Sequence, residues 1–272
     1  MTGATLAALS IAGSDSSAGA GLQADLKTFS ALGVYGATVV TAVTAQNTQG
    51  VTAIHLVPGK VISAQLDAVF SDLSIRAIKT GMFGNEEGIS AAAGSLERLA
   101  GGIPIIVDPV MISTSGSRLL PKGAEKALAQ KLIPLAALLT PNLHEAAALL
   151  GSEAAQNENE MRRQAKRLLA LGARAVLIKG GHLSGPEAAD VFYGGSRFLS
   201  YSAPRIATKN THGTGCTLSS AIAACLVKGL PMEEAIAEAK AYLQGAIEQA
   251  AGLHIGSGAG PLWHFYRQTP PR

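Results

Sequence analysis

Short apolar runs alternate with longer amphipathic segments along almost the whole chain, and this alternation constrains the fold more than any other feature. The apolar runs are typical of buried strands. The longer segments carry apolar residues at helical spacing, as at Leu66, Val69, Phe70 and Leu73. Strands that alternate with amphipathic helices form βαβ units, in which helices cover both faces of a mainly parallel sheet. The pattern therefore predicts an α/β fold.

The predicted elements extend from the first residues to the last quarter of the chain. The strands are predicted at residues 7–12, 37–45, 52–57, 77–80, 105–108, 137–140 and 175–179, with an antiparallel pair near 190–193 and 198–202. The helices are predicted at residues 22–32, 61–73, 86–100, 123–132, 143–150, 161–171, 217–228 and 233–250. No linker rich in proline, serine or charge divides them, so we expect a single domain over residues 1–272.

The composition excludes several classes of protein. Hydrophobic residues make up 47% of the chain and charged residues only 15%, which suits helices packed closely on a buried sheet. A net charge of +3 without a lysine or arginine cluster gives no basis for binding nucleic acid. No apolar run is long enough to span a membrane. The two cysteines form neither a disulfide framework nor a zinc spacing, so we expect a reducing, cytoplasmic location.

Polar and glycine-rich clusters follow one predicted strand after another. In open α/β sheets, ligands bind outside the carboxyl ends of the strands. The repetition of such clusters at these ends therefore predicts a ligand site more firmly than any single cluster does. The clusters are residues 13–15, 46–47, 79–82, 108–109, 140–142 and 179–181.

Residues 211–216 (THGTGC) form a glycine-rich segment just before an apolar helix. Exposed N–H groups and the helix dipole at such a place attract an anion, and a phosphate is the natural guest. Alternatively, Thr214 caps the helix and the glycines only turn the chain. Cys216 also has two interpretations: a small buried hydrophobe, or a thiol whose pKa falls at a helix N-terminus so that it accepts a proton. Cys225 lies in the apolar body of the same helix and is expected to pack in the core.

Four further polar residues end predicted strands or begin the helices that follow. Asn142 and Glu145 have the spacing of a helix N-cap with a reciprocating carboxylate, and the same carboxylate suits Mg²⁺. Asp108 is either functional or a turn cap, and Lys179 either pairs with a phosphate or reaches solvent. His212 lies in the candidate phosphate loop, and the histidines have no zinc spacing.

Taken together, these segments resemble the ribokinase-like superfamily, and within it the hydroxymethylpyrimidine/phosphomethylpyrimidine kinases of thiamine biosynthesis. The resemblance implies a three-layer αβα sandwich with a mainly parallel central sheet. It also implies ATP-dependent phosphorylation, with Mg²⁺, of the hydroxymethyl group of 4-amino-5-hydroxymethyl-2-methylpyrimidine and then of the monophosphate. The matching segments are 11–17 (IAGSDSS), 19–27 (GAGLQADLK), 44–50 (TAQNTQG), 79–82 (KTGM), 108–111 (DPVM), 140–145 (TPNLHE), 178–182 (IKGGH) and 212–216 (HGTGC).

The resemblance also implies where the pyrimidine binds. In this family the ring lies between the end of the first strand, here at Gly13, and the segments that carry Gln46 and Met82. By that match Asp25 and Gln46 would hydrogen-bond the aminopyrimidine edge. Met82 and Val110 would flank the ring, and residues 110–117 resemble a flap that closes over the substrate and excludes water.

The resemblance implies catalytic roles for the glycine-rich segment. Cys216 stands where many relatives carry aspartate and would be the proton acceptor. The N–H groups of Gly213, Thr214, Gly215 and Cys216 would stabilise the transferring phosphoryl oxygens.

The nucleotide and metal roles come from the same match. Lys179 would pair with the ATP phosphates, with Asn142 and Thr211 beside it. Asn142 and Glu145, with Asp108 as a second carboxylate, would organise Mg²⁺.

Two residues depart from the family pattern. Ala18 stands where glycine is expected and would slightly crowd the substrate loop, whereas His144 stands where proline is usual and is expected to point outward. The family also suggests a homodimer.

The closest alternative function is a pyridoxine/pyridoxal kinase, because related enzymes carry the same cysteine motif. A catalytically silent vitamin-binding protein is disfavoured by the intact motifs. A ribose-type sugar kinase is disfavoured by the cysteine.

Overall fold

The computed structural model describes residues 6–112, 116, 119–121 and 123–268. Its strands are β1 (Ala7–Asp15), β2 (Tyr35–Asn47), β3 (Gly50–Leu56), β4 (Ile75–Thr80), β5 (Ile105–Val107), β6 (Leu138–Leu139), β7 (Val176–Ile178), β8 (Glu187–Tyr193) and β9 (Phe198–Pro204). Within the described residues they form one sheet in the order β3-β2-β1-β4-β5-β6-β7-β8-β9. The strands from β2 to β7 in this order run parallel, and antiparallel partners extend the sheet at both edges.

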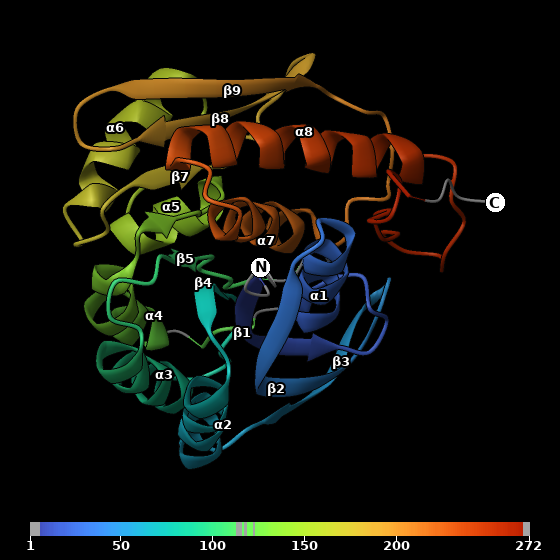
Figure 1. Cartoon of the computed structure of the whole chain (residues 1–272). Helices are drawn as coiled ribbons and strands as arrows, with labels where there is room; N and C mark the ends of the chain where they lie inside the picture. Colours follow the sequence, from blue (N-terminus) through green and yellow to red (C-terminus); the bar gives the residue numbers. More distant parts are fainter. Residues whose placement is uncertain (1–5, 113–115, 117–118, 122, 269–272) are drawn as a thin grey trace.

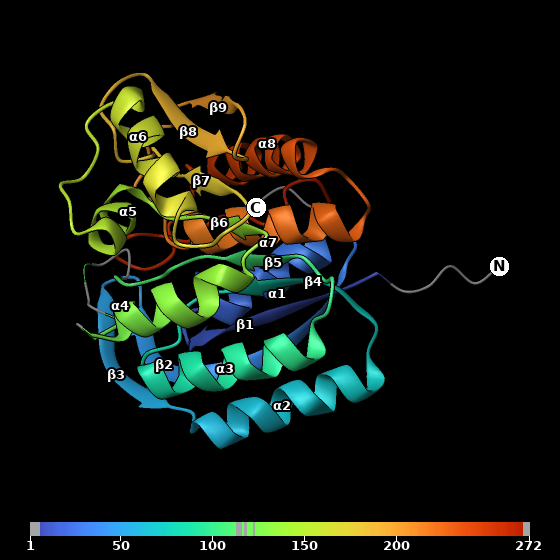
Figure 2. The same ribbon diagram turned by 90° about the vertical axis from the view of Figure 1, so that its left-hand side faces the viewer.

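Helices cover both faces of this sheet and produce three layers (Figures 1 and 2). The helices α2 to α6 pack on one face, and α1, α7 and α8 pack on the other. The αβα architecture implied by the resemblance is therefore confirmed. Their bounds are α1 (Gly21–Ala31), α2 (Gly59–Asp72), α3 (Glu86–Leu99), α4 (Ala124–Ala127), α5 (Leu143–Leu150), α6 (Glu158–Leu169), α7 (Thr214–Val227) and α8 (Met232–Ala250).

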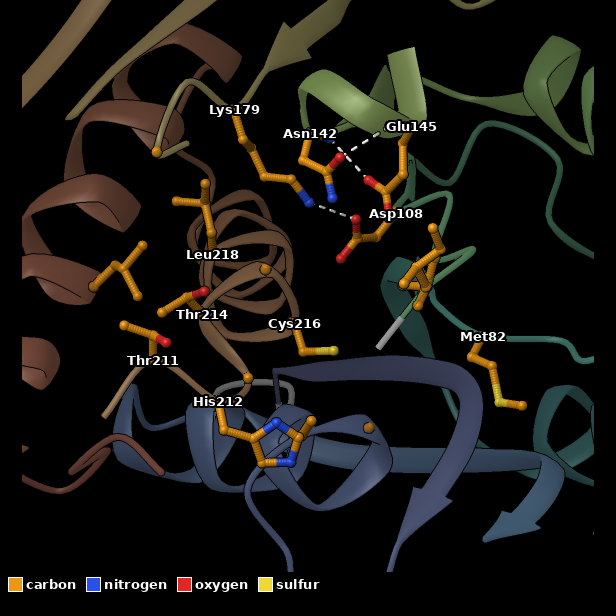
Figure 3. A pocket seen from close by; sticks show the side chains of 18 of the residues that line it. Met82, Asp108, Asn142, Glu145, Lys179, Thr211, His212, Thr214, Cys216 and Leu218 are labelled. Carbon is orange, nitrogen blue, oxygen red and sulfur yellow. Dashed lines mark hydrogen bonds and ion pairs between the residues drawn. The ribbon is translucent and has the colours of Figure 1, made fainter. Parts of the chain in front are cut away.

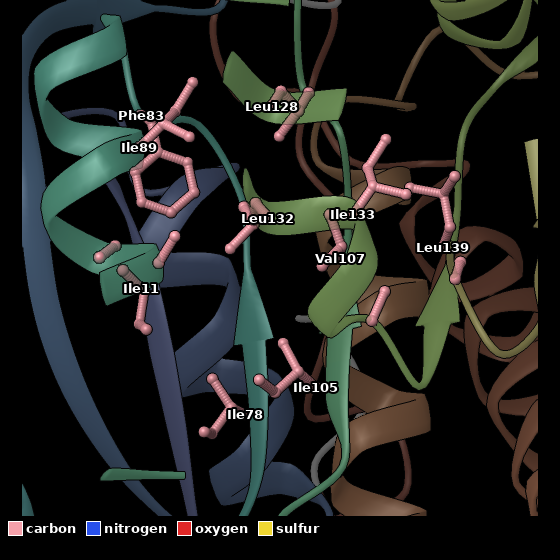
Figure 4. Close-up of a cluster of buried hydrophobic side chains, with 14 of the residues drawn as sticks. Ile11, Ile78, Phe83, Ile89, Ile105, Val107, Leu128, Leu132, Ile133 and Leu139 are labelled. Carbon is pink, nitrogen blue, oxygen red and sulfur yellow. The ribbon is translucent and has the colours of Figure 1, made fainter. Parts of the chain in front are cut away.

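The two faces of the central strands bury separate hydrophobic clusters. Successive side chains of a strand point to opposite faces. Accordingly Ile105 and Val107 pack toward α3, whereas Ile106 between them packs toward α7. Figure 4 shows Ile105 and Val107 with Ile78 and Phe83 in the first cluster. Because β5 is buried on both faces, it is an uninterrupted apolar run rather than an alternating one.

Each predicted strand and helix is present, with ends that differ by a few residues, but the prediction for 123–132 needs correction. The segment is not one regular α-helix. After α4, the backbone widens into a π-helical turn at Leu128–Leu132 and then tightens into a 3₁₀ turn at Ile133–Leu135. Pro134 explains the change, because it has no N–H to continue the α-helical hydrogen bonds.

The start of α7 also differs from the sequence prediction. The helix begins at Thr214 rather than at residue 217, so Cys216 lies in its first turn. The N-cap residue is Gly213, whose φ of 86° is in the left-handed region that favours glycine. The interpretation of Thr214 as a side-chain cap is therefore wrong.

The C-terminal segment after α8 folds back onto α7 and α8. The Tyr242 hydroxyl donates a 2.7 Å hydrogen bond to the backbone oxygen of His264. Tyr266 lies so close to Gly245 that a Cβ there would be 2.5 Å from its ring. His264 is buried, with Nε2 3.0 Å from Thr217 Oγ1 in the first turns of α7. The tail thus supports the helix that carries Cys216.

Thr80, the last residue of β4, provides a test of core packing. Its Oγ1 is buried and has no hydrogen-bond partner within the described part of the chain, and alternation places it on the face of Ile78. Because an unpaired buried hydroxyl is costly, we expect Thr80→Val to raise the free energy of unfolding by about 1 kcal/mol. Urea denaturation measures this value. Thr80→Ser keeps the hydroxyl and loses a methyl group, so it should be less stable than the wild type; a destabilised valine variant would contradict the prediction.

His264 provides a test of stability against pH. Burial, with a smaller effect of Lys27, lowers the pKa of His264 to about 4. Between pH 4 and 6.5 the unfolded chain then binds more protons at this residue than the folded chain does. Stability is therefore lost as pH falls through this window, by up to roughly 3 kcal/mol.

We expect His264→Gln to flatten the decline of unfolding free energy between pH 6.5 and 4. His254 is exposed, so His254→Gln is a matched control that should leave the decline unchanged. Equal declines in the wild type and the His264→Gln protein would contradict the assignment.

Candidate active site

The carboxyl ends of the parallel strands meet in one cavity of about 520 Å³, a size suited to small ligands. β1 pairs with β2 on one side and with β4 on the other, so the sheet reverses its winding direction at β1. Such a switch point opens a crevice between neighbouring connections. All the residues predicted for the site line the cavity except Asp25: Gly13, Gln46, Met82, Asp108, Val110, Asn142, Glu145, Lys179, Thr211, Gly213, Thr214, Gly215 and Cys216.

The glycine-rich loop packs directly against the loop that follows β1. A Cβ at Gly213 would lie 1.9 Å from the backbone oxygen of Gly19, and a Cβ at Gly19 would lie 2.3 Å from His212 Cδ2. Both positions therefore require glycine. The first N–H groups of α7 have no partner within the helix and lie beside the cavity. Free N–H groups at a helix N-terminus beside a cavity are suited to an anion.

Cys216 lies on the wall of the cavity, and Figure 3 shows its sulfur pointing into the space between Met82 and the Lys179–Asp108 pair. Burial raises the pKa of its thiol to about 11. Lys79 acts in the opposite direction, and Asp25 and Asp108 raise the pKa further. The interpretation in which the thiol pKa falls is not supported by this structure, because the loss of solvent outweighs the nearby positive charge.

A buried ion pair lies behind Cys216. Lys79 Nζ is 2.8 Å from Asp25 Oδ2, and both side chains are fully buried. The hydroxyls of Ser10 and Ser220 also donate to the Asp25 carboxylate. Burial alone would lower the pKa of Lys79, but Asp25 and then Cys216 raise it above its usual value, so the ammonium stays charged.

This arrangement corrects the role expected for Asp25. Its carboxylate is not exposed to the cavity and already accepts hydrogen bonds from Lys79, Ser10 and Ser220. It therefore does not meet the edge of a substrate in this structure. Spacing along the sequence could not reveal this, because Asp25 lies on the buried face of α1 while Gln46 faces the cavity.

A second polar cluster forms at the ends of β5, β6 and β7 (Figure 3). Lys179 Nζ lies 2.7 Å from Asp108 Oδ1. The Asn142 side chain accepts the N–H groups of His144 and Glu145, and Glu145 Oε2 accepts the Asn142 N–H at 2.8 Å. The predicted helix cap is confirmed. Lys179 is paired within the protein rather than reaching solvent.

The cluster suits a divalent cation that prefers oxygen. Burial raises the pKa of Glu145 to about 7; Lys179 lowers it and the nearby Asp108 raises it. The carboxylates of Asp108 and Glu145 share the single positive charge of Lys179. A bound Mg²⁺ would supply the second positive charge, and it prefers carboxylate oxygens as ligands. Residues Asp108 and Glu145 would hold it, with the Asn142 side chain beside them.

Two polar contacts that sequence reasoning missed shape the opposite end of the cavity. His212 Nε2 lies 2.8 Å from Asp15 Oδ2, although the residues are 197 positions apart. Asp15 also accepts the N–H groups of Gly19 and Ala20, which fixes the loop after β1. Burial raises the pKa of Asp15, but hydrogen bonds from His212 and Ser17 hold it below its usual value.

A third missed contact anchors the loop that follows Lys179. Lys240 on α8 pairs with Asp190 at 2.6 Å, and Asp190 accepts the Gly180 N–H at 2.9 Å. Gly180 belongs to one of the glycine clusters visible in the sequence, and the structure explains it: a Cβ there would lie 2.0 Å from the backbone oxygen of Ala189. Its partners on β8 and α8 have no such signal.

The two departures from the family pattern have local consequences. Ala18 has a φ of 61°, which favours glycine, so its methyl group strains the backbone of the loop after β1. His144 is exposed, but its ring lies 5.7 Å from that of His182 at the cavity rim. Of the expected flap at 110–117, residues 113–115 and 117 lie outside the described residues.

Comparisons with known proteins identify the family. The family model described as phosphomethylpyrimidine kinase matches residues 15–263. The chain belongs to the phosphomethylpyrimidine kinase family. It is 57% identical over 263 residues to the hydroxymethylpyrimidine/phosphomethylpyrimidine kinase of Rhizobium meliloti strain 1021, covering 97% of this chain and 98% of that one.

Solved structures give the same family and a neighbouring one. The phosphomethylpyrimidine kinase of Clostridium difficile 630 is 45% identical, with a TM-score of 0.79 over 89% of this chain and 99% of that one. The pyridoxal kinase of Staphylococcus aureus, in complex with AMP-PCP and pyridoxal, is 35% identical, with a TM-score of 0.89 over 98% of this chain and 96% of that one.

Among the residues described here, no helix is both long and apolar enough to cross a membrane.

The Lys79–Asp25 pair generates a stability prediction. Asp25→Asn would leave the Lys79 ammonium buried without its counter-charge, and Lys79→Met would leave the carboxylate without its ammonium. We expect either change to lower the free energy of unfolding by about 3 kcal/mol. The double variant removes both charges and should be more stable than either single variant. Thermal and urea unfolding of all four proteins measure the coupling, and additive losses would contradict it.

Proposed function

We propose that this protein transfers the γ-phosphoryl group of ATP to the hydroxymethyl group of 4-amino-5-hydroxymethyl-2-methylpyrimidine and then to the resulting monophosphate, giving the diphosphate. The observation that carries the proposal is the joint position of Gln46, Met82 and Cys216 in one cavity with the Lys179–Asp108 pair. The full-length identity of 57% to a kinase of this name supports it.

The pyrimidine binds at the end of the cavity near β1 and β2. Gln46 presents a carboxamide to the ring edge, and Met82 and Val110 supply apolar contacts to its faces. Gly13 keeps this end open, because a Cβ there would lie 2.6 Å from Met82 Sδ. The hydroxymethyl group then lies toward Cys216, in the middle of the cavity.

ATP occupies the other end. Its phosphates lie between Lys179 and the N–H groups from Gly213 to Cys216, and Thr211 is beside them. Apolar side chains line the space beyond for the base: Ile206, Leu218, Leu243 and Ile247. Asp108 and Glu145 would hold Mg²⁺, which, when bound, would offset the negative charge of the phosphates.

The chemistry required of the chain is mostly positioning. The substrate oxygen attacks the γ-phosphorus as the bond to the leaving ADP oxygen breaks, and Cys216 accepts the hydroxyl proton. Lys79 behind the thiol favours the thiolate that this step needs. The amides at the start of α7 stabilise the charge on the transferring oxygens.

Pyridoxal phosphorylation is the second candidate activity. The Staphylococcus aureus pyridoxal kinase superposes with a TM-score of 0.89, so the fold alone does not separate the two substrates. The identity of 57% against 35% favours the pyrimidine. We further propose a single kinase domain over residues 1–272, a cytoplasmic location and a homodimer.

A substrate panel tests the assignment. The purified protein is incubated with ATP and Mg²⁺ and with the hydroxymethylpyrimidine, its monophosphate, pyridoxine or pyridoxal, and mono- and diphosphate products are followed by chromatography. We expect both pyrimidine steps. Phosphorylation of pyridoxal alone would overturn the proposal.

The role of Cys216 is tested by removing its sulfur. We expect Cys216→Ala to bind the pyrimidine with nearly unchanged affinity but to lower kcat by about 10²- to 10⁴-fold, because the proton acceptor is lost. Steady-state kinetics and calorimetry measure the two quantities. Cys225→Ala is the matched control, because this thiol packs in the core, away from the cavity, and its loss should leave kcat near the wild-type value. Undiminished turnover of Cys216→Ala would exclude the thiol from the mechanism.

A further inference from the structure

The Gln46 side chain makes two polar contacts within the described residues, and the chemistry of both partners dictates which way its carboxamide points. Gln46 Nε2 lies 3.4 Å from His212 Nε2, and Oε1 lies 3.1 Å from Thr44 Oγ1. A half-turn about the last side-chain bond exchanges these two atoms without moving the rest of the residue. The hydrogen-bond partners must therefore decide between the two orientations.

The first constraint comes from His212. Its Nε2 lies 2.8 Å from Asp15 Oδ2, and an ionised carboxylate can only accept hydrogen bonds. Asp15 is held ionised by donors on every side: the Ser17 hydroxyl and the N–H groups of Ser17, Gly19 and Ala20. His212 Nε2 therefore carries a proton, which it donates to Asp15, and it has no lone pair left to accept a hydrogen bond from the Gln46 amide. Electrostatics then places the Gln46 oxygen, rather than its NH₂ group, beside this N–H.

The second constraint comes from Thr44 and is independent of the first. Its hydroxyl lies 2.8 Å from the backbone oxygen of Ser14, which can only accept, so the single hydroxyl proton is donated there. Thr44 Oγ1 can then only accept from Gln46, and the Gln46 atom facing it must be a donor. Both constraints are satisfied when Oε1 faces His212 and Nε2 faces Thr44.

The surroundings make this orientation rigid. The Gln46 backbone is fixed on both sides by Ser16 Oγ, which accepts from its N–H at 2.8 Å and donates to its oxygen at 2.7 Å. Thr44 is buried within β2, and His212 is buried between Asp15 and Gly19. Turning the carboxamide would break its hydrogen bond to Thr44 Oγ1 and would place its NH₂ group against the His212 N–H.

We infer that His212 and Thr44 fix the hydrogen-bonding direction of the Gln46 carboxamide, and that they thereby determine whether the enzyme accepts an amino or an oxo group on the ring of its substrate. The inference rests on the proposed function, because it takes the ring facing Gln46 to be a pyrimidine. In the 4-aminopyrimidine the amino group is a hydrogen-bond donor and the adjacent ring nitrogen N3 is an acceptor. In the 4-oxo analogue the oxygen is an acceptor and the N3–H is a donor, so the order is reversed. A fixed carboxamide matches one order only, whereas a freely turning one matches both. His212 and Thr44 are positioning residues in this scheme.

The orientation is tested directly by the protonation of His212. Nuclear magnetic resonance of protein labelled with ¹⁵N-histidine distinguishes a protonated ring nitrogen from an unprotonated one, and the His212 signals are assigned by their loss in His212→Gln. We expect a proton on Nε2 at neutral pH. An unprotonated Nε2 would overturn the inference, whatever the substrate proves to be.

The consequence for specificity is tested by ligand affinity. Calorimetry gives the ratio of the dissociation constants of 5-hydroxymethyl-2-methylpyrimidin-4-one and the 4-amino compound for each protein. We expect the wild type to favour the amino compound. His212→Phe, which keeps a ring but loses the donor, should reduce this preference about tenfold, the equivalent of one hydrogen bond. Thr44→Val should reduce it in the same direction.

Conservative variants separate positioning from general damage. His212→Gln restores an N–H donor near the position of Nε2, and Thr44→Ser restores the hydroxyl, so both should keep the wild-type preference. Equal preferences in the wild type, His212→Phe and Thr44→Val would overturn the inference even if overall affinity falls. If the wild type binds neither pyrimidine, the proposed function fails, while the protonation of His212 still decides the orientation of Gln46.

Discussion

The buried ion pair between Lys79 and Asp25 holds together the elements that build the active site. Asp25 lies on α1 and Lys79 on β4, and Ser10 of β1 and Ser220 of α7 complete the hydrogen bonds of the carboxylate. A charged pair without solvent is tolerated only when such donors and acceptors are in place. Any shift of α7 relative to the sheet would therefore disturb this pair. The position of Cys216, in the first turn of α7, is fixed by the same contacts.

The pair also sets the electrostatics of the thiol. Burial raises the pKa of Cys216 to about 11, and the Lys79 ammonium acts against this effect. Because charges interact more strongly away from water, the burial that disfavours a thiolate also strengthens the influence of Lys79. Across the cavity, Asp108 and Lys179 are paired and Glu145 has a pKa of about 7, near the point of gaining or losing its proton. A cation bound at Asp108 and Glu145 would therefore lower the pKa of Glu145 and keep its carboxylate ionised.

The parts of the site that the sequence predicts are those encoded by local spacing. Asp108 and Lys179 end parallel strands, whose carboxyl ends share one edge of the sheet, and Asn142 with Glu145 has the spacing of a helix cap. The contact between Asp15 and His212 spans 197 positions, and no periodicity reports it. The thiol pKa could not be predicted for a related reason. A helix N-terminus can be identified from the sequence, but the loss of solvent at Cys216 depends on which elements meet there. The same limit applies to Asp25: its segment, residues 19–27, resembles the family pattern, but its side chain faces the interior.

Two glycine-containing loops crowd together between the ends of the cavity that are proposed for the substrate and for the phosphates. Gly213 and Gly19 approach so closely that neither accommodates a Cβ, and His212 fills the space beside Gly19. The loop after β1 also holds Asp15, which binds the His212 ring, while the backbone of His212 leads directly into the first turn of α7. His212 therefore contacts Gln46 on one side and leads into the amides at the start of α7, which are proposed to bind the phosphates, on the other. A displacement of the substrate loop would be transmitted to those amides through backbone contacts that have no room to absorb it.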